Sequence, residues 1–463
     1  MASFTVEVVE SMIEEQKKFF FTGLTREIDF RKKQLLKLKQ KIKHYEDEIL
    51  HALNLDLHKS EFEAYSNEVG IVLDSIQYMI KNIEDWSKPI EVKTPLHFQP
   101  AKSFIVREPY GVALIIGPFN YPFQLVMEPL IGAIIGGNTA IVKPSETAVH
   151  TAKIIKKIIE ETFDTSYVRV VEGEKEEVTA LIHASFDYIF FTGSVAVGKV
   201  IMRAASEKLT PITLELGGKS PTIVDQTADL EVAAKRIVWG KFNNTGQTCV
   251  APDYVLVHAS VYNKFMKIMK KTITQFYGKD AQKSKDYGRV INERQFNRLQ
   301  ELLEAEKNQI TFGGRTDKKD LYIEPTILEN ISWNSPIMED EIFGPILPII
   351  SYEDLNMAIH QIRKLPKPLA AYFFSENKKA IDFFLQELPF GGGCINDTVT
   401  HVANPYLPFG GVGSSGVNAY HGKASFENFT HAKSIMKRSS KLANNLLFPP
   451  YKQKVKLVRK MLK

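Results

Sequence analysis

The fold is decided by the stretch Val112-Ala-Leu-Ile-Ile-Gly-Pro-Phe-Asn-Tyr-Pro122. Its first five residues are apolar without alternation, which favours a strand buried on both faces, and the next six form a turn with two prolines. Further short apolar runs lie at 139–142, 167–171 and 188–191, with helical patterns at 151–163 and 178–184. Alternation of this kind predicts a mostly parallel sheet with helices on both faces.

The same alternation resumes after Leu216. Apolar runs at 222–224, 254–258, 347–351, 370–374 and 394–395 alternate with helical patterns at 229–243, 260–276, 353–363 and 378–388. Two successive α/β units predict two α/β domains with a ligand cleft between them. Upstream, the spacing of apolar residues predicts one long amphipathic helix over 29–57 and another over 68–86.

The composition is that of a soluble globular protein. The chain has 463 residues, of which 44% are hydrophobic and 24% charged, so more than one domain is expected. No apolar run is long enough to span a bilayer, and the first residues do not fit a signal peptide. Two cysteines make no disulfide framework, which favours a reducing, cytoplasmic location.

The net charge of +5 comes from the C-terminal tail. Residues 451–463 carry six Lys and Arg and no acid, so the rest of the chain has a charge of −1. We therefore expect no nucleic-acid surface. Val455, Val458 and Leu462 recur on one face of a helical pattern between the lysines. That face could touch an anionic membrane, but a solvated dimer arm is the favoured interpretation.

Cys249 and Glu215 are the strongest chemical candidates. Cys249 follows Gly246, Gln247 and Thr248, which do not form an apolar core face, although a buried free cysteine is the ordinary alternative. Glu215 ends an apolar run, where a carboxylate needs a partner such as Lys219 or a function as a general base of raised pKa. Together they suggest a thioester on the thiol and a carboxylate that activates water.

Other polar residues also follow predicted strands. Asn120 is either a turn residue or an amide donor to an oxyanion. Lys143 and Glu146 are either solvated charges or ligands of cofactor hydroxyls, and Glu146 would favour NAD over NADP by repelling a 2′-phosphate. Gly193 and Ser194 begin a G-x-x-x-x-G run without a Walker lysine, where a phosphate could meet a helix N-terminus. We expect no metal.

Taken together and in order, these motifs resemble the aldehyde dehydrogenase superfamily over nearly the whole chain. The set comprises Pro-Phe-Asn-Tyr-Pro (118–122), Lys-Pro-Ser-Glu (143–146), Phe-Thr-Gly-Ser (191–194), Leu-Glu-Leu-Gly-Gly-Lys (214–219), Gly-Gln-Thr-Cys (246–249), Glu-Ile-Phe-Gly-Pro (341–345) and Pro-Phe-Gly-Gly-Val-Gly (408–413). The C-terminal Tyr-His-Gly-Lys (420–423) and Phe119 resemble the class 3 and fatty-aldehyde branch.

The resemblance implies a domain plan and a partner. Residues 1–215 would hold N-terminal helices and a Rossmann-like NAD-binding domain, with a bridging segment near 87–108. Residues 216–400 would form the catalytic thiol domain. Residues 401–463 would return to the cofactor domain and end in a bridging arm that builds a homodimer.

The resemblance also implies NAD(P)-dependent oxidation of an aliphatic, aromatic or long-chain aldehyde to its acid. Cys249 would form the thiohemiacetal and thioester, Asn120 would hold the oxyanion and Glu215 would activate water. Glu341 would hold the nicotinamide ribose, with Phe343 beside it. Lys143 and Glu146 would hold the adenosine ribose. Gly193 and Ser194 would lie beside the pyrophosphate. NAD is the expected cofactor, with NADP possible.

Two other functions stay open. One is CoA-dependent or acyl-phosphate chemistry on the same scaffold, in which the glutamate would be expendable. The other is a non-catalytic binding protein. Cys394 is interpreted as structural and His421 as a branch marker with a structural hydrogen bond. Asn418 stands where the branch usually has glycine, and we expect it to take a left-handed conformation.

Overall fold

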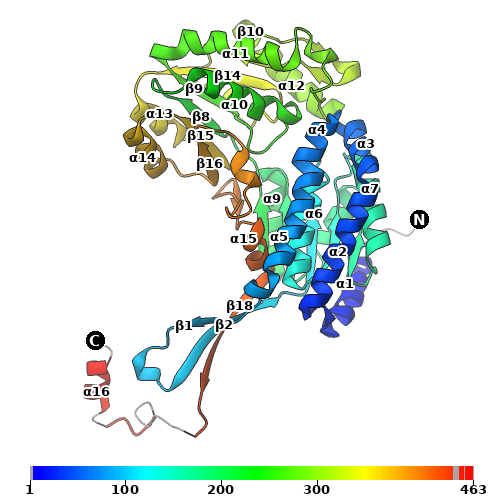
Figure 1. Ribbon diagram of the computed structural model, residues 1–463, viewed down its shortest axis with the longest axis vertical. Coiled ribbons are helices and arrows are strands. Elements are labelled where there is room, and N and C mark those ends of the chain that lie inside the picture. The colour runs from blue at the N-terminus through cyan, green and yellow to red at the C-terminus, as the bar shows by residue number, and fades with distance from the viewer. Residues whose placement is uncertain (1–3, 442–447, 453, 462–463) are drawn as a thin grey trace.

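The protein is built around two sheets, each with its own helices, joined below to a small extended arm (Figure 1). The computed structural model describes residues 4–441, 448–452 and 454–461. Among helices in those ranges, none combines the length and the apolar content needed to cross a bilayer. The expected α/β class is observed.

The first sheet has six strands in the order β17-β7-β6-β3-β4-β5. Their bounds are β3 (Val112–Ile116), β4 (Thr139–Lys143), β5 (Val168–Val170), β6 (Tyr188–Thr192), β7 (Ile212–Glu215) and β17 (Gly416–Val417). All neighbours are parallel except β17, which runs antiparallel to β7. Every residue of β3, β4 and β6 is buried, as an uninterrupted apolar run predicts.

Helices cover both faces of this sheet. Ala113 and Ile115 of β3 pack in one hydrophobic cluster with α2 (Ile28–His44), α5 (Gly70–Trp86), α6 (Gln124–Gly136) and α7 (Val149–Thr162). Val112 and Leu114 point to the opposite cluster, with α1 (Val6–Phe21), α8 (Lys175–Ile182) and α9 (Val195–Lys208). The period of two along the strand therefore divides the core into two layers.

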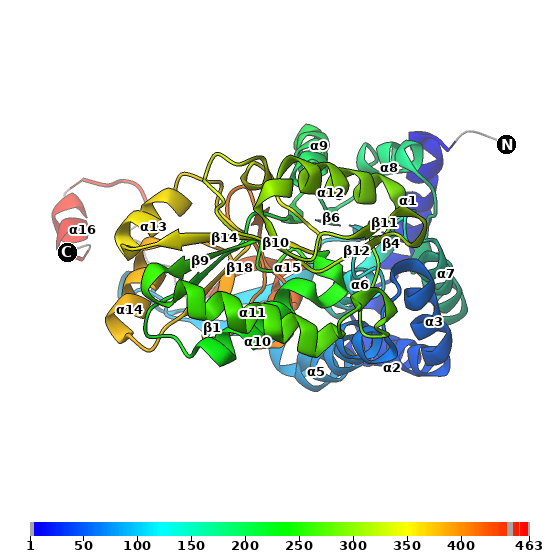
Figure 2. The same cartoon turned by 90° about the horizontal axis from the view of Figure 1, so that it is seen from above.

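The second sheet has seven strands in the order β10-β13-β14-β9-β8-β15-β16. They are β8 (Pro221–Val224), β9 (Tyr254–His258), β10 (Ile310–Phe312), β13 (Thr326–Leu328), β14 (Ile346–Tyr352), β15 (Ala370–Phe374) and β16 (Gly392–Ile395). Helices α10 (Leu230–Phe242) and α11 (Tyr262–Tyr277) lie on one face, and α12 (Glu293–Ala305), α13 (Leu355–Ile362) and α14 (Lys378–Glu387) on the other (Figure 2). A separate hairpin joins β11 (Thr316–Asp317) and β12 (Tyr322–Ile323).

One expectation for the N-terminal region is wrong. The single helix expected over 29–57 is two helices, α2 and α3 (Glu46–Leu57), separated at Tyr45. The acidic residues Glu46, Asp47 and Glu48 form the first turn of α3, where they stabilise a new N-terminus. Further on, α4 (Glu61–Ala64) and a π-helical turn, η2 (Tyr65–Val69), lead into α5.

A three-stranded arm extends from the body. It consists of β1 (Ile90–Val92), β2 (Ala101–Pro109) and β18 (Thr430–Arg438), all antiparallel, so segments from the two ends of the chain lie side by side (Figure 1). A short helix, α15 (Gly422–Asn428), precedes β18. The basic tail forms helix α16 (Lys454–Met461), in which Val455 and Leu457 are exposed. Leu462 lies outside the described residues.

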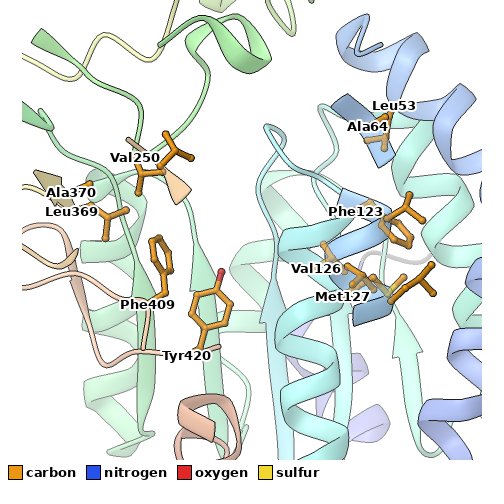
Figure 3. Close-up of a cluster of buried hydrophobic side chains, with 14 of the residues drawn as sticks. Leu53, Ala64, Phe123, Val126, Met127, Val250, Leu369, Ala370, Phe409 and Tyr420 are labelled. Atoms are coloured by element: carbon orange, nitrogen blue, oxygen red, sulfur yellow. The ribbon is translucent and has the colours of Figure 1, made fainter. Parts of the chain in front are cut away.

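Helix α6 lies within the hydrophobic core of the six-stranded sheet. All thirteen of its residues are buried, which explains why its sequence is apolar all round. Phe123, Val126 and Met127 belong to one hydrophobic cluster with Val250 and Tyr420, so this cluster runs through both α/β units (Figure 3). Glu128 is an ionisable residue in this otherwise mainly apolar helix. Its buried Oε2 accepts a hydrogen bond from Ser75 Oγ at 2.8 Å.

The buried carboxyl of Glu128 should make the stability of the fold depend on pH. Burial raises the pKa of this carboxyl to about 8, so between pH 4.5 and 8 the folded protein keeps a proton that the unfolded chain releases. Stability from this group is therefore lost as pH rises. We expect Glu128→Gln to raise Tm relative to the wild type increasingly from pH 5 to pH 8. The exposed Glu160→Gln on α7 is the control, and a Tm difference that does not change with pH would contradict the assignment.

Candidate active site

The cysteine lies in a strained loop after α10. Asn244, Thr245 and Gly246 have positive φ values of 50°, 55° and 74° in succession, and Cys249 follows, half-buried. Left-handed conformation is rare for a β-branched residue such as Thr245, and it persists only where the surroundings enforce it. At Gly246 an added Cβ would lie 2.3 Å from the carbonyl oxygen of Gly344. The loop therefore requires glycine at this position.

Asn120 joins this loop from the other sheet. It lies in the turn that follows β3 and is 3% exposed. Its Nδ2 donates to the carbonyl oxygen of Gln247 at 3.0 Å, two residues before the cysteine. Tyr121 adds a second link, with its hydroxyl 2.8 Å from Thr248 Oγ1. The Asn120 turn and the Cys249 loop are thus joined by contacts between the two α/β units.

Glu215 is a buried carboxyl without a partner. It ends β7, is 2% exposed, and neither side-chain oxygen has a hydrogen-bond partner among the described residues. Burial raises its pKa well above the usual range of a carboxyl. The alternative ion pair with Lys219 is wrong, because Lys219 Nζ lies 2.6 Å from Asp253 Oδ2 instead. An unpaired buried carboxyl is costly, which is typical of a functional group.

Glu341 and Phe343 come from a loop of the second unit. An added Cβ on Gly217 would lie 2.0 Å from Glu341 Oε2, so the carboxyl lies directly against the glycine turn after Glu215. Burial, with the nearby charge of Asp253, raises the pKa of Glu341 to about 8. Phe343 has a φ of 48°, and its ring lies 5.8 Å from that of Phe119 in an edge-to-face contact.

A buried ion pair fixes the Glu341 loop. Lys219 Nζ donates to the carbonyl oxygens of Ile337 and Asp340, both at 2.9 Å, besides its bond to Asp253. The other oxygen of Asp253 accepts the Ile342 N–H at 2.9 Å. Lys219 belongs to a motif noted in the sequence, but its partner lies 34 residues away, and no local pattern indicates Asp253.

The pKa of the Cys249 thiol is raised by its surroundings. Burial raises the pKa of Cys249, and the nearby charges of Glu341 and Glu215 raise it further, although two backbone hydrogen bonds act in the opposite direction. These couplings place both carboxyls in the electrostatic environment of the sulfur. A thiol of this kind attacks only after a base removes its proton.

Further predicted residues lie at the carboxyl ends of β4 and β6. Lys143 ends β4, is buried, and its Nζ lies 3.0 Å from the exposed carboxylate of Glu146. Gly193 follows β6 and donates its N–H to Glu215 O at 3.0 Å. Ser194 caps the N-terminus of α9, accepting from Val197 N. The predicted residues therefore form two groups. One group surrounds the Cys249 loop, and the other lies at the carboxyl edge of the six-stranded sheet.

Comparison with known proteins identifies the family. The aldehyde dehydrogenase family model matches residues 1–435. The chain belongs to the aldehyde dehydrogenase family. It is 53% identical over 458 residues to 4,4′-diaponeurosporen-aldehyde dehydrogenase of Staphylococcus aureus, covering 99% of this chain and 100% of that protein. A substrate-bound S. aureus AldH structure, 53% identical, aligns with a TM-score of 0.96 over 98% of this chain and 99% of that one.

The predicted branch is confirmed as well. A dimeric NADP-preferring aldehyde dehydrogenase of Canis lupus familiaris is 46% identical, covering 93% of this chain and 94% of its own. The family 3 member A2 enzyme of Rattus norvegicus is 45% identical, covering 96% and 91%. The resemblance drawn from the motifs is therefore correct. So is the expectation of an enzyme that oxidises aldehydes with NAD or NADP.

Several residues of this aldehyde dehydrogenase were noted without an assigned role. Asn418 has a φ of 68°, so the expected left-handed conformation is confirmed. His421 is buried and stacks on Phe409 at 5.2 Å, and its Nε2 has no partner within the described residues. Cys394 Sγ lies 3.6 Å from His401 Nδ1 and 3.7 Å from Thr400 Oγ1. Within the described residues no His, Cys, Asp and Glu cluster is arranged for a metal ion.

Sequence reasoning missed the residues that support the site. Gln247 lies inside the Gly-Gln-Thr-Cys motif and Asn244 lies two residues before it, so their closeness to Cys249 in the sequence could have indicated both. Lys59 and Glu68 carry no such signal. Lys59 lies between the helices expected over 29–57 and 68–86, Glu68 begins the second of them, and neither belongs to a motif. Both are fully buried and form an ion pair beside Asn120.

Gly246 offers a direct test of this geometry in the enzyme. Gly246→Ala adds a Cβ against the backbone of Gly344, so the cysteine loop must move, and we expect aldehyde-oxidising activity to fall about a hundredfold. Gly278→Ala is the matched control. Its φ of 78° is nearly the same, but nothing lies within 4 Å, so only backbone strain is added. Initial rates of aldehyde oxidation measure the loss of activity in both variants, and melting curves measure their stability. Equal activity losses would contradict the close-contact argument.

Proposed function

We propose that this aldehyde dehydrogenase converts an aldehyde to its carboxylic acid through a thioester on Cys249. One observation carries the proposal: Glu215 is a buried carboxyl whose two side-chain oxygens have no hydrogen-bond partner among the described residues. Asn120 supplies a side-chain amide in the adjoining loop. A nucleophile, a base and an oxyanion donor are the groups that this reaction requires.

The proposed steps follow from these three side chains. The Cys249 thiol first gives its proton to solvent water. The thiolate sulfur then bonds to the aldehyde carbon as the carbonyl π bond opens, and the carbonyl oxygen becomes an oxyanion that the Asn120 amide and the Cys249 backbone N–H stabilise. Oxidation of this thiohemiacetal leaves a thioester. Glu215 then takes a proton from water as the water oxygen bonds to the thioester carbon. The carbon–sulfur bond breaks, the acid leaves, and the thiolate is restored.

NAD or NADP, when bound, supplies the hydride acceptor that this oxidation needs. The residues present fit such a dinucleotide. Glu341 lies against the Gly217 turn and has no ion pair among the described residues, so its carboxyl can accept hydrogen bonds from ribose hydroxyls. Gly193 and Ser194 begin the fourteen-residue helix α9, whose N-terminal N–H groups can hold a pyrophosphate. Lys143 and Glu146 end β4 with a polar pair suited to the adenosine ribose.

Glu215 also argues against the two alternatives. Transfer of the acyl group to CoA or phosphate requires no water-activating carboxylate, so its burial without a partner would be an uncompensated cost. A non-catalytic binding protein would likewise gain nothing from a strained cysteine loop held beside Asn120. Both alternatives predict that Glu215 is dispensable.

The thioester route predicts distinct behaviour of two variants. We expect Cys249→Ala to lose steady cofactor reduction. Glu215→Gln should give at most a single burst of reduced cofactor followed by turnover slower by about 10² to 10⁴. Absorbance of the reduced cofactor in stopped-flow and steady-state experiments measures both, with Glu128→Gln as a control for replacing a buried carboxyl. Unchanged activity without Cys249 would overturn the proposal.

We also propose that NAD is preferred over NADP. Glu146 places an exposed carboxylate next to Lys143, and a carboxylate at the adenosine ribose repels a 2′-phosphate. We expect kcat/KM to be higher with NAD, and Glu146→Gln to reduce the NAD-to-NADP ratio about tenfold. Equal efficiency with NADP would contradict the role of Glu146, and it would agree with the preference named for the canine relative.

The aldehyde itself is proposed from the relatives. The S. aureus relative is named for a carotenoid-derived aldehyde, which favours a long-chain, apolar substrate for this enzyme. The dimeric name of the canine relative supports a homodimer, for which the arm of β1, β2 and β18 offers exposed apolar residues such as Ile90, Val92 and Met436. The cytoplasm remains the proposed location. Contact of the tail with a membrane stays the less favoured interpretation.

A further inference from the structure

A buried polar network connects the N-terminal helices to both catalytic loops. Lys59 lies just before α4, fully buried, and its ammonium forms an ion pair with Glu68 of η2. The same Nζ donates to the backbone oxygen of Asn120 at 2.9 Å and lies 4.0 Å from the centre of the Tyr121 ring. The cation thus contacts the peptide that carries the oxyanion donor.

Glu68 fixes the other end of that turn. Its Oε2 accepts the N–H groups of Phe123 and Gln124 at 2.9 and 3.2 Å, which are the free donors at the start of α6. A carboxylate at a helix N-terminus also interacts favourably with the helix dipole. One ion pair therefore holds the turn from both sides, at Asn120 and at the first turn of α6.

The cysteine loop is held from the same helical segment. Glu63 of α4 accepts the Asn244 N–H at 2.5 Å. Asn244 Nδ2 in turn donates to the backbone oxygens of Asn120 at 2.8 Å and Gln247 at 3.0 Å. These bonds lie on the left-handed run that ends at Gly246, so they supply the external contacts that such strain requires.

We propose that Lys59, Glu68 and Glu63 are positioning residues for catalysis, which fix the Asn120 amide relative to the Cys249 loop. This inference rests on the proposed function. The three side chains reach the reaction only through other residues, by hydrogen bonds to backbone groups and by the contact of Lys59 with the Tyr121 ring, and none of them contacts the thiol. Their function is geometric, because misplacing a donor or nucleophile by about 1 Å is enough to cost about a hundredfold in rate.

The test is a double-mutant cycle with Asn120→Ala. The ion pair is neutralised in one step, Lys59→Met with Glu68→Gln, because removing one partner alone leaves a buried charge and destabilises the fold. We expect kcat for aldehyde oxidation to fall about tenfold with KM nearly unchanged. In the Asn120→Ala background the same pair change should have little further effect, because the group it positions is gone.

Two readouts separate positioning from general damage. Alkylation of Cys249 by iodoacetamide, followed on its peptide by mass spectrometry, requires no oxyanion donor and should keep its wild-type rate in the pair variant. Glu128→Gln, a neutralised carboxyl elsewhere on α6, should leave kcat unchanged. Glu63→Ala tests the second contact and is the alternative if the pair variant does not fold, with the same expected non-additivity toward Asn120→Ala.

Each failure has its own meaning. Full activity of Asn120→Ala would overturn the oxyanion role and hence the proposed function. Loss of activity in Asn120→Ala, with an equal further loss on adding the pair change, would overturn only the positioning role. If neither the pair variant nor Glu63→Ala folds while Glu128→Gln does, the network serves stability, and the positioning role is contradicted.

Discussion

Parallel pairing is the constraint on which this site depends. Strands β4, β3, β6 and β7 run in the same direction, so their carboxyl ends meet at one edge of the sheet. Lys143, Asn120, Gly193 and Glu215 follow or end these four strands in turn. Residues up to 95 positions apart thereby share one edge. Such edges collect ligands in open α/β sheets because loops there can vary without disturbing the strands.

The second sheet supplies the groups that the first cannot. Cys249 and Glu341 both come from loops of the seven-stranded unit, and contacts between Asn120 and Gln247 and between Phe119 and Phe343 join the two units at the site. Burial then determines the electrostatics. Three acids, Cys249, Glu215 and Glu341, have raised pKa values, and burial is the main cause for each of them. Such a site favours proton transfer between neighbours.

Local sequence predicted the strands well and one helix poorly. Apolar runs such as Val112–Ile116 and Ala370–Phe374 coincide with β3 and β15, because strands buried on both faces are apolar without alternation. The helix expected over 29–57 is broken at Tyr45, although Leu38, Ile42 and Ile49 on its apolar face are fully buried. The heptad-like spacing of Ile42 and Ile49 continues across the break, so periodicity alone does not reveal it.

The sequence by itself determined the fold class, the family and the identity of the candidate residues, because these depend on strand patterns and on short motifs whose members are close in the chain. Only the tertiary structure decided the partners of those residues. Lys219 pairs with Asp253 rather than Glu215, and Lys59 and Glu68 lie beneath Asn120. Such pairings form because a buried charge must be paired, and tertiary packing determines which opposite charge lies nearby. The residues around each charge in the sequence do not indicate that partner.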